Sequence, residues 1–163
     1  MKKLITLTLL LFSSYYCFSQ QTLLRYYNGK QRKHFYTTDF NEYGNGKNGW
    51  VLEGPACTVY TAEDRGRSIV PLFRYFNKQT GDHYYTLRYE EYGRGGNGYY
   101  LEGPACYINM YQAPGSVPLL KYFNPYTGDH FYTIDRHELG RGGFDGYQFK
   151  GVEGFVYPAN PQR

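Results

Sequence analysis

The sequence predicts an all-β protein, and more narrowly a β-trefoil built from three repeats of about 48 residues, each with about four short strands. Two observations predict it. The chain is rich in Tyr (21), Phe (11) and Gly (20), and aromatic residues favour strands while glycines favour turns. One sequence pattern also occurs three times, centred on His34, His83 and His130. Another closed β-barrel or a β-sandwich is the alternative.

Residues 1–20 are expected to be a secretory signal peptide. A basic start at residues 1–3 precedes an apolar run at residues 4–12 and then polar and small residues. That run is too short to span a bilayer, and no second such run follows, so no transmembrane segment is expected. We therefore expect a secreted protein, extracellular or periplasmic. Residues 21–163 are expected to form one domain, with repeats at about 22–70, 71–117 and 118–159.

Each repeat opens with an aromatic-rich strand that ends in an asparagine, at Asn28, Asn77 or Asn124. A short turn follows, and in the second and third repeats it contains Thr-Gly-Asp. Glycine supplies a left-handed backbone without steric cost, and the Asp side chain can close the turn. A second strand is then expected through the sequence His-aromatic-Tyr-Thr.

The second half of each repeat begins with a short helical turn, NEYG, EEYG or HELG. A glycine-rich loop leads to a third strand, such as GWVLEG or GYYLEG, and a fourth strand, CTVYTA, CYINMY or GFVYP, closes the repeat. Pro71 and Pro118 mark the boundaries, where a strand tolerates proline. One repeat has too little core to stand alone. A closed arrangement with approximate three-fold symmetry would bury the strand edges, as in a trefoil.

These motifs resemble the repeat of the family catalogued as domain of unknown function 5648. The resemblance is carried by PLFRYFN (71–77), TGDHYYT (80–86) and EYGRGGNGYYLEGPACYI (91–108), and it covers all three repeats, about residues 23–157. It implies an accessory domain of exported bacterial or fungal proteins, alone or attached to hydrolases. The family label implies no activity and therefore no mechanism.

Two positions depart from the shared motif. Lys33 stands in the first repeat where the others have Asp82 and Asp129. Lys150 stands in the third repeat where the others have Glu53 and Glu102. Any site built on these positions is therefore expected to differ between repeats.

The charge of the chain argues against nucleic acid as a partner. The formal net charge is +4, and removing Lys2 and Lys3 with the leader lowers it to +2. Such a weak and scattered excess favours neither nucleic acid nor an anionic membrane. No cofactor is predicted.

The histidine motif is assigned to architecture. Adjacent residues on a strand point to opposite faces, so Asp82 and His83 diverge, and no nucleophile elbow accompanies them. A three-histidine zinc site would need the histidines near the axis, and nothing in the sequence places them there, so no metal is predicted. The residues assigned to the common architecture are His34, His83, His130, Tyr36, Tyr85 and Tyr132. The repeated carboxylates Glu42, Glu91 and Glu138 are expected to serve within their own repeats, for instance in salt bridges to Arg25, Arg74 or Lys121.

Cys57 and Cys106 occupy the same place in the first two repeats, and Gly154 takes that place in the third. Export permits a disulfide between them, provided that the Cα atoms lie close enough. Replacement by glycine favours a tight position that accepts only small residues. Two buried thiols are therefore the preferred interpretation, and a disulfide is the alternative.

Carbohydrate binding is the remaining candidate chemistry. A sugar site needs a flat aromatic face beside planar polar groups, and the glycine-rich loops flank such aromatic residues. The position of Asp82 and Asp129 is not the same residue in all three repeats. It is therefore the part of the histidine motif where a ligand contact is expected. The candidate ligand-binding residues are Trp50, Tyr99, Tyr147, Asn77, Asp82, Asn124 and Asp129.

The sequence thus predicts a secreted, non-catalytic binding module for a glycan or another cell-surface or cell-wall polymer. The first alternative is a protein-binding module, a hydrolase inhibitor or adhesion partner, that uses the unrepeated stretch at residues 61–70. An enzyme is the second alternative.

Overall fold

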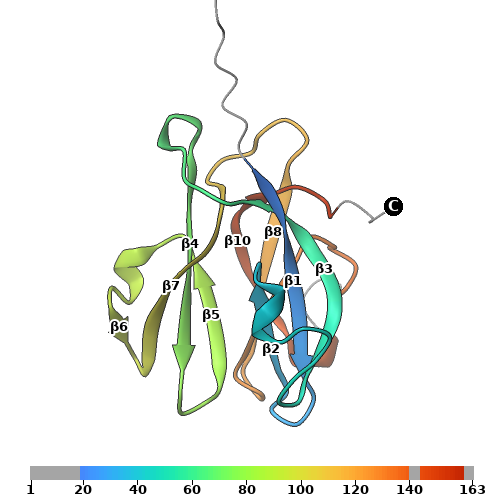
Figure 1. Ribbon diagram of the computed structural model, residues 1–163. Coiled ribbons are helices and arrows are strands. Elements are labelled where there is room, and N and C mark those ends of the chain that lie inside the picture. Colours follow the sequence, from blue (N-terminus) through green and yellow to red (C-terminus); the bar gives the residue numbers. More distant parts are fainter. Residues whose placement is uncertain (1–18, 140–143, 160–163) are drawn as a thin grey trace, which may run out of the picture.

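The computed structural model describes residues 19–139 and 144–159 of the chain. The expected signal peptide lies outside the described residues except for its last two positions. Ten strands form the described part, joined by turns and short 3-10 helices (Figure 1). None of the helices in these two ranges is long and apolar enough to cross a membrane.

Three sets of strands follow one another, and we call them units 1, 2 and 3. Unit 1 contains β1 (Gln20–Asn28), β2 (Lys33–Thr37), η1 (Phe40–Glu42) and β3 (Trp50–Tyr60). Unit 2 contains β4 (Ile69–Asn77), β5 (Asp82–Thr86), η3 (Tyr89–Glu91), β6 (Gly95–Gly96) and β7 (Tyr99–Asn109). Unit 3 contains β8 (Val117–Asn124), β9 (Asp129–Thr133), η4 (Phe144–Gly146) and β10 (Gln148–Val156). The helix η2 (Arg65–Arg67) lies in the connection between units 1 and 2.

The first strand of each unit lies between the other two in an antiparallel sheet. β1 pairs with β2 and β3, β4 with β5 and β7, and β8 with β9 and β10. The registers agree: the opposed pairs are Arg25–Tyr36, Arg74–Tyr85 and Lys121–Tyr132. A slip of one residue in a pairing would turn every side chain of the strand to the other face. Because the registers agree, equivalent residues of the three units point to the same face of the sheet.

The prediction of an all-β protein is confirmed, but the sheet formed by the described strands is not closed into a barrel. The expected third and fourth strands of each repeat are also one continuous strand, β3, β7 or β10. The reason is a pair of bulges beside a glycine of positive φ, at Gly54 (130°), Gly103 (125°) and Gly151 (122°). A bulge bends a strand and re-aims its side chains without ending it.

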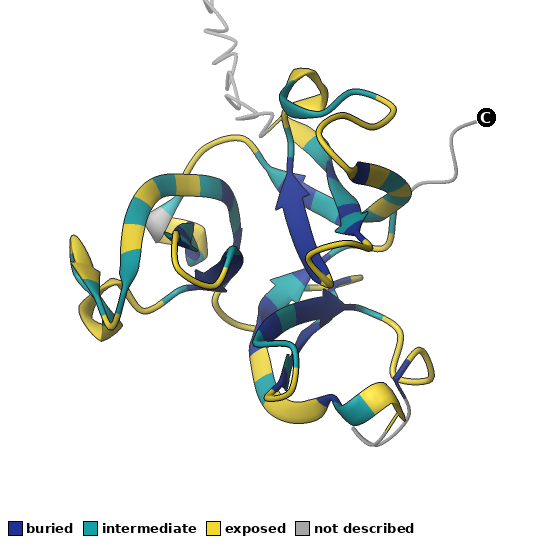
Figure 2. Ribbon diagram, turned by 90° about the horizontal axis from the view of Figure 1, so that it is seen from below, coloured by how far each residue is buried: buried dark blue, intermediate teal, exposed yellow. Residues whose placement is uncertain are grey.

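The innermost strands are β2, β5 and β9, which contact one another and are almost entirely buried. Seen along the axis, the three units stand around this common centre (Figure 2). Each inner strand is a sheet edge, so its outward main-chain groups need partners from outside the sheet.

Three tyrosines supply those partners. The Tyr36 hydroxyl donates to the carbonyl oxygen of Tyr132 at 2.8 Å and accepts from its amide at 2.8 Å. Tyr132 bonds in the same way to Tyr85 (2.7 and 2.9 Å), and Tyr85 to Tyr36 (2.7 and 2.8 Å). The three rings meet edge to face, with centroids 5.4 to 5.6 Å apart. This closed cycle, the tyrosine ring, joins all three units.

The long strands meet at the opposite end of the axis. Tyr60 pairs with Tyr107, Asn109 with Phe155 and Thr58 with Tyr157. Cys57 and Cys106 lie in the core there, and both carry free thiols. A Cβ atom at Gly154, the matching position in unit 3, would come within 2.7 Å of Ile108 Cδ1 and 3.0 Å of Asn109 O. Crowding therefore explains the glycine at this position.

We predict that Tyr85→Phe lowers the free energy of unfolding by about 2–4 kcal/mol, because the buried amide and carbonyl of Tyr36 both lose their partner. Urea unfolding measures this. The matched control is Tyr126→Phe, which removes a hydroxyl from a side chain that is 87% exposed and should change stability by less than about 0.5 kcal/mol. Equal effects of the two substitutions would contradict a stabilising tyrosine ring.

Candidate functional site

The side chains with polar chemistry gather where neighbouring units meet. We call the interface of units 3 and 1 interface A, that of units 1 and 2 interface B, and that of units 2 and 3 interface C. Matching registers bring equivalent residues to each interface. An interface whose residues differ from those of the other two is therefore the candidate for a function beyond holding the units together.

Interface A is crossed by a charge cluster centred on Arg25. Its Nε bonds Glu53 of unit 1 and its Nη2 pairs with Glu138 of unit 3, both at 2.8 Å. Glu53 is a bulge residue of β3, which aims its carboxylate at this cluster. The guanidinium also lies over the ring of Phe131, 4.9 Å from its centroid. These contacts link two units.

Interface B repeats the cluster with Arg74. It pairs with the bulge residue Glu102 at 2.8 Å and with Glu42 of unit 1 at 3.1 Å, over the ring of Phe35. The expectation that the repeated carboxylates act within their own repeats is therefore wrong for Glu42. The reason is that the first strand of one unit packs against the second strand of the unit before it. Glu138 serves both units, because it also accepts from Thr133 of unit 3, and Glu91 accepts from side chains of its own unit.

Interface C carries a different set of residues. Lys121 replaces arginine and bonds Glu153, the second bulge residue of β10, at 2.5 Å. Its Nζ also bonds the Tyr84 hydroxyl at 3.1 Å, and that hydroxyl donates to Glu91 at 2.9 Å. Tyr84 thus links Lys121, which is shorter than arginine, to Glu91. At interfaces A and B the arginine reaches the equivalent carboxylate directly.

Two histidines are held by aspartates from another unit. His130 Nδ1 lies 2.6 Å from Asp82 Oδ2, and the His130 amide donates to Asp82 Oδ1 at 3.0 Å. The Tyr99 hydroxyl donates to the same Oδ2 at 2.5 Å. Burial and the Asp82 charge raise the pKa of Tyr99, so it stays a donor. Asp82 is fully buried, and both of its oxygens are bonded within the protein.

His34 has the same surroundings at interface A. Its Nδ1 lies 2.6 Å from Asp129 Oδ2 and its amide donates to Oδ1 at 2.7 Å, while the Tyr147 hydroxyl donates to Oδ2 at 2.5 Å. Asp129 is likewise fully buried. The structure therefore places the two aspartates, where a ligand contact was expected, in positions that hold histidines.

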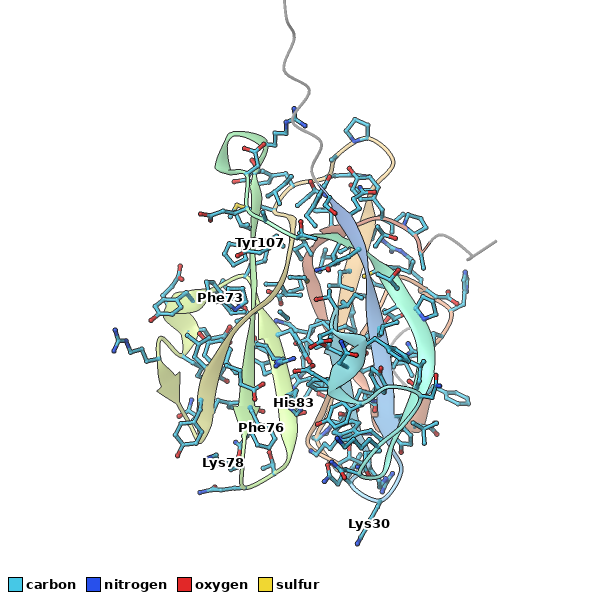
Figure 3. The ribbon with its side chains drawn as sticks, in the orientation of Figure 1. Lys30, Phe73, Phe76, Lys78, His83 and Tyr107 are labelled. Carbon is cyan, nitrogen blue, oxygen red and sulfur yellow. The ribbon has the colours of Figure 1, made fainter. Side chains whose placement is uncertain are left out.

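Interface B lacks this arrangement around His83. Lys33 stands at the aspartate position and donates to the carbonyl oxygens of Thr127 (2.7 Å) and Gly128 (2.6 Å). Trp50, without a hydroxyl, stands at the tyrosine position and contacts the His83 ring. Among the described residues no partner reaches the buried Nδ1 of His83. Figure 3 shows His83 beside Phe76, on which it stacks at 4.6 Å.

The repeated asparagines tie each hairpin turn to the glycine-rich loop. Asn124 Oδ1 accepts from the Thr127 amide at 3.2 Å, and its Nδ2 donates to the Asp145 carbonyl at 2.8 Å. Asn77 makes the same pair of contacts with Thr80 and Asn97. Both asparagines are buried, so their polar atoms serve the fold.

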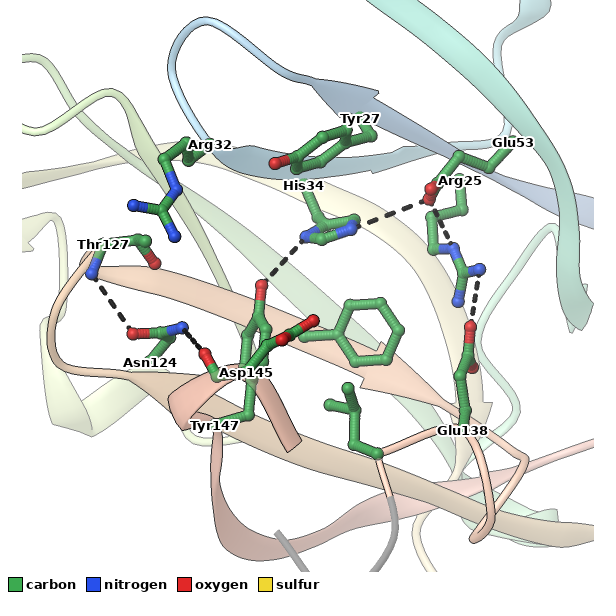
Figure 4. Close-up of a pocket in the computed structure, with 12 residues that line it drawn as sticks. Arg25, Tyr27, Arg32, His34, Glu53, Asn124, Thr127, Glu138, Asp145 and Tyr147 are labelled. Atoms are coloured by element: carbon green, nitrogen blue, oxygen red, sulfur yellow. Dashed lines mark hydrogen bonds and ion pairs between the residues drawn. The ribbon is translucent and has the colours of Figure 1, made fainter. Parts of the chain in front are cut away.

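A pocket of about 500 Å³ opens at interface A (Figure 4). In the other two units a tyrosine after the short helix, Tyr43 or Tyr92, packs on the loop aromatic Trp50 or Tyr99 with centroids 5.4 and 5.2 Å apart. Unit 3 has Leu139 at this position. The missing ring leaves the space in front of Tyr147.

The pocket lining is polar with aromatic walls. Phe131, Tyr147 and Tyr27 supply the walls, and the Tyr27 ring lies 4.7 Å from the ring of His34. The Arg25 cluster closes one side. The full lining is Arg25, Tyr27, Arg32, His34, Glu53, Asn124, Thr127, Phe131, Glu138, Leu139, Asp145 and Tyr147. The pocket thus combines aromatic faces with charged and amide groups.

Of the predicted binding residues, the structure brings Tyr147 and Asn124 to this pocket. Tyr99 lines a shallower hollow of about 440 Å³ beside the glycine-rich loop of unit 2, together with Tyr100. Trp50 is buried and fills interface B. Sequence reasoning did not place Arg25, Tyr27, Arg32, Glu53 and Leu139 together around one pocket. A signal existed for Leu139, since it alone breaks the tyrosine pattern of its position.

No metal centre is apparent in the part of the chain that the structure describes, where no group of three or more His, Cys, Asp or Glu side chains could hold an ion. The histidines are separated by aromatic rings from neighbouring units: Phe131 lies against His34, Phe35 against His83 and Tyr84 against His130.

Comparison with known proteins gives a family and no function. The family model described as Domain of unknown function (DUF5648) matches residues 22–157. No curated protein and no solved structure matches the chain.

We predict that Lys33→Asp and Trp50→Tyr are coupled. Lys33→Asp alone buries a carboxylate that lacks the tyrosine donor, and Trp50→Tyr alone buries a hydroxyl that lacks its acceptor. The two together rebuild the set formed by Asp82, Tyr99 and His130. The double variant should be more stable than the sum of the singles by at least about 1 kcal/mol in urea unfolding. Additive effects would contradict this account of the two substitutions.

We predict that His83 stays neutral in the folded protein down to acidic pH. Burial, aided by the Arg74 charge, lowers its pKa from 6.5 to about 3. Because the unfolded chain binds this proton more readily, the free energy of unfolding should fall as the pH decreases from about 6.5 towards 3. Side-chain NMR of the histidine resonances measures the pKa. A folded-state titration of His83 near pH 6.5 would contradict the assignment, and the double variant above should raise the value.

Proposed function

The chain belongs to the family described as Domain of unknown function (DUF5648), and we propose that it is an exported, non-catalytic binding module for a glycan or another cell-surface or cell-wall polymer. The observation that carries this proposal is the pocket at interface A. Interface C has a hollow of about 260 Å³ lined by Lys121 and His130. The pocket at interface A is larger, about 500 Å³, and Leu139 stands there in place of the tyrosine.

The lining suits a sugar better than an apolar ligand. Sugar rings offer apolar faces for aromatic contact and hydroxyl groups for planar polar partners. Tyr27 and Phe131 supply aromatic surface, and the Arg25 cluster supplies carboxylate acceptors that are partly exposed, about a third for Glu53 and Glu138. Because these side chains hold one another by ion pairs, little ordering entropy is lost when a ligand binds.

The position of the pocket also supports a polymeric ligand. It lies between the hairpins of β1–β2 and β8–β9 (Figure 4). The hollow lined by Tyr99 and Tyr100 lies at unit 2 and offers a second aromatic surface. Two weak contacts to one polymer strengthen binding through effective concentration.

The three units have the same strand order and stand around one axis, which is the arrangement expected of a trefoil. We propose that the units correspond to trefoil repeats that depart from a trefoil by leaving the barrel open. The matching registers and the tyrosine ring support this relation.

Protein binding is the second candidate, favoured by the connection between β3 and β4. Figure 1 shows this segment projecting at one end of the molecule, beside the connection between β7 and β8, and its sequence is not repeated elsewhere in the chain. Asp64 orders it by accepting from the Gly66 amide at 3.0 Å and by main-chain bonds to Ile69. A projecting, ordered loop is the usual contact of a small protein inhibitor.

We predict that Leu139→Tyr abolishes glycan binding without loss of fold, because it installs the side chain that fills the matching space in units 1 and 2. A glycan array identifies the ligand, and calorimetry should then show at least a tenfold weaker affinity. The matched control is Val51→Tyr, which installs the residue found at Tyr100 on an exposed site and should keep the affinity within about twofold.

Two outcomes would contradict the proposal. If no glycan binds while one protein does, the protein-binding alternative replaces it. If Leu139→Tyr binds as well as wild type, the pocket is not the site. Circular dichroism checks the fold. Should Leu139→Tyr unfold, Tyr27→Ala tests the same pocket through a half-buried side chain.

A further inference from the structure

Arg32 has a backbone conformation that arginine rarely adopts. Its φ is 57°, in the left-handed region, at the turn position where the other two hairpins have Gly81 (72°) and Gly128 (66°). Glycine takes this conformation freely, whereas a residue with a Cβ is strained in it. Strain that persists where glycine is the simpler solution points to a role for the side chain.

That side chain lines the pocket at interface A. Arg25 and Arg74 each have two carboxylate partners. The Arg32 amide donates to the Asn28 carbonyl at 2.7 Å, but no hydrogen bond or ion pair reaches the Arg32 side chain from residues 19–139 or 144–159. The guanidinium is exposed and presents several donors in a planar fork. It is therefore available to a ligand, unlike the other two arginines.

Two hydroxyl groups lie on the same pocket. Thr127 Oγ1 is buried, and it too lacks a hydrogen-bond partner within the described ranges. Tyr27 stands where β4 and β8 have Phe76 and Phe123, so unit 1 alone carries a hydroxyl at this position. Figure 4 shows Arg32 and Thr127 on one side of the pocket, with the Tyr27 ring near His34 along the adjacent wall.

The two sides of the pocket differ in charge. Lys33 lies beneath the Arg32 side, where its Nζ bonds the Thr127 carbonyl at 2.7 Å. On the opposite side the single charge of Arg25 is shared between Glu53 and Glu138, which leaves carboxylate oxygens as acceptors. Asp145 also lines the pocket, beside Asn124, whose Nδ2 donates to its carbonyl oxygen at 2.8 Å. A ligand that matches both sides has an anionic group at one end and hydroxyl donors at the other.

We propose that the pocket binds a uronic-acid residue of a glycan, with the sugar carboxylate at Arg32, Thr127 and Tyr27 and the sugar hydroxyls at the Arg25 cluster. This rests on the proposed glycan-binding function and specifies its ligand class. The arginine fork fits a carboxylate by two parallel hydrogen bonds, and the two hydroxyls add donors beside it. The pocket volume of about 500 Å³ accommodates one or two sugar rings.

The test is an oligosaccharide array in matched pairs, each uronic-acid oligosaccharide beside its carboxyl-reduced form, with sulfated glycans as a third arm. Wild type should bind the acidic member at least about tenfold more tightly than the reduced member. Arg32→Gly, which installs the residue of the other two hairpins, should remove that preference and keep the fold. Lys30→Ala removes a cation from the same turn, and Figure 3 shows Lys30 pointing away from the molecule, so this control should keep the preference.

The outcomes separate this inference from the proposed function. Equal binding of acidic and reduced members, or a preference that survives Arg32→Gly, overturns the uronic-acid assignment while glycan binding stands. Preference for sulfated over uronic-acid glycans overturns the carboxylate assignment as well. Binding to no glycan overturns the proposed function and this inference together. Thermal unfolding of Arg32→Gly at or above the wild-type temperature excludes misfolding as the cause of any loss, since glycine is unstrained at this φ.

Discussion

The fold depends on three hydroxyl groups that bond the main chain of three inner strands, one from each unit. At the centre, β2, β5 and β9 turn unpaired main-chain groups towards one another, which would be costly in a buried place. A closed barrel solves that problem by pairing every edge with another strand. Here Tyr36, Tyr85 and Tyr132 solve it with side chains, each bonding both main-chain groups of the next tyrosine. The inner strands of the three units therefore stay unpaired with one another, while the long strands join the units and side chains of all three share the core around the tyrosine ring.

This constraint explains why the axis is uniform while the interfaces differ. Replacing any tyrosine of the ring would leave a main-chain amide and carbonyl of another unit without a hydrogen-bond partner. The interfaces, in contrast, tolerate substitutions that occur together in matched sets. Lys33 occurs with Trp50, which removes a carboxylate together with the hydroxyl that would donate to it. Lys121 occurs with Tyr84 and Glu153, which extend the reach of a shorter cation and supply its carboxylate. Such sets are energetically coupled, so their members are explained only together.

Much of the fold could be predicted from the sequence because repetition and composition are properties of the chain. The all-β class follows from the composition, and the assignment of Tyr36, Tyr85 and Tyr132 to the architecture follows from aligning the copies, although their hydrogen-bonding role does not. What could not be predicted is which residues from different copies meet. Asp82 and His83 are neighbours in sequence and diverge, while Asp82 bonds His130 across 48 positions. The pocket was missed for the same reason: Leu139 looks like an ordinary apolar residue until the matching tyrosines are seen packed on Trp50 and Tyr99.

The tyrosine ring also has a consequence for how the chain reaches its native state. Two of its links join consecutive units, over separations of 49 and 47 residues, but the third joins Tyr36 to Tyr132 across 96. Closing a loop of that length costs conformational entropy. The hydrogen bonds that offset this cost form only when the third unit has packed against the first two. When only two units have formed, one tyrosine hydroxyl and the main-chain amide and carbonyl of another tyrosine still lack their partners in the third unit. Assembly is thus cooperative over the whole domain, in contrast to a solenoid, where each repeat is completed by its neighbour alone.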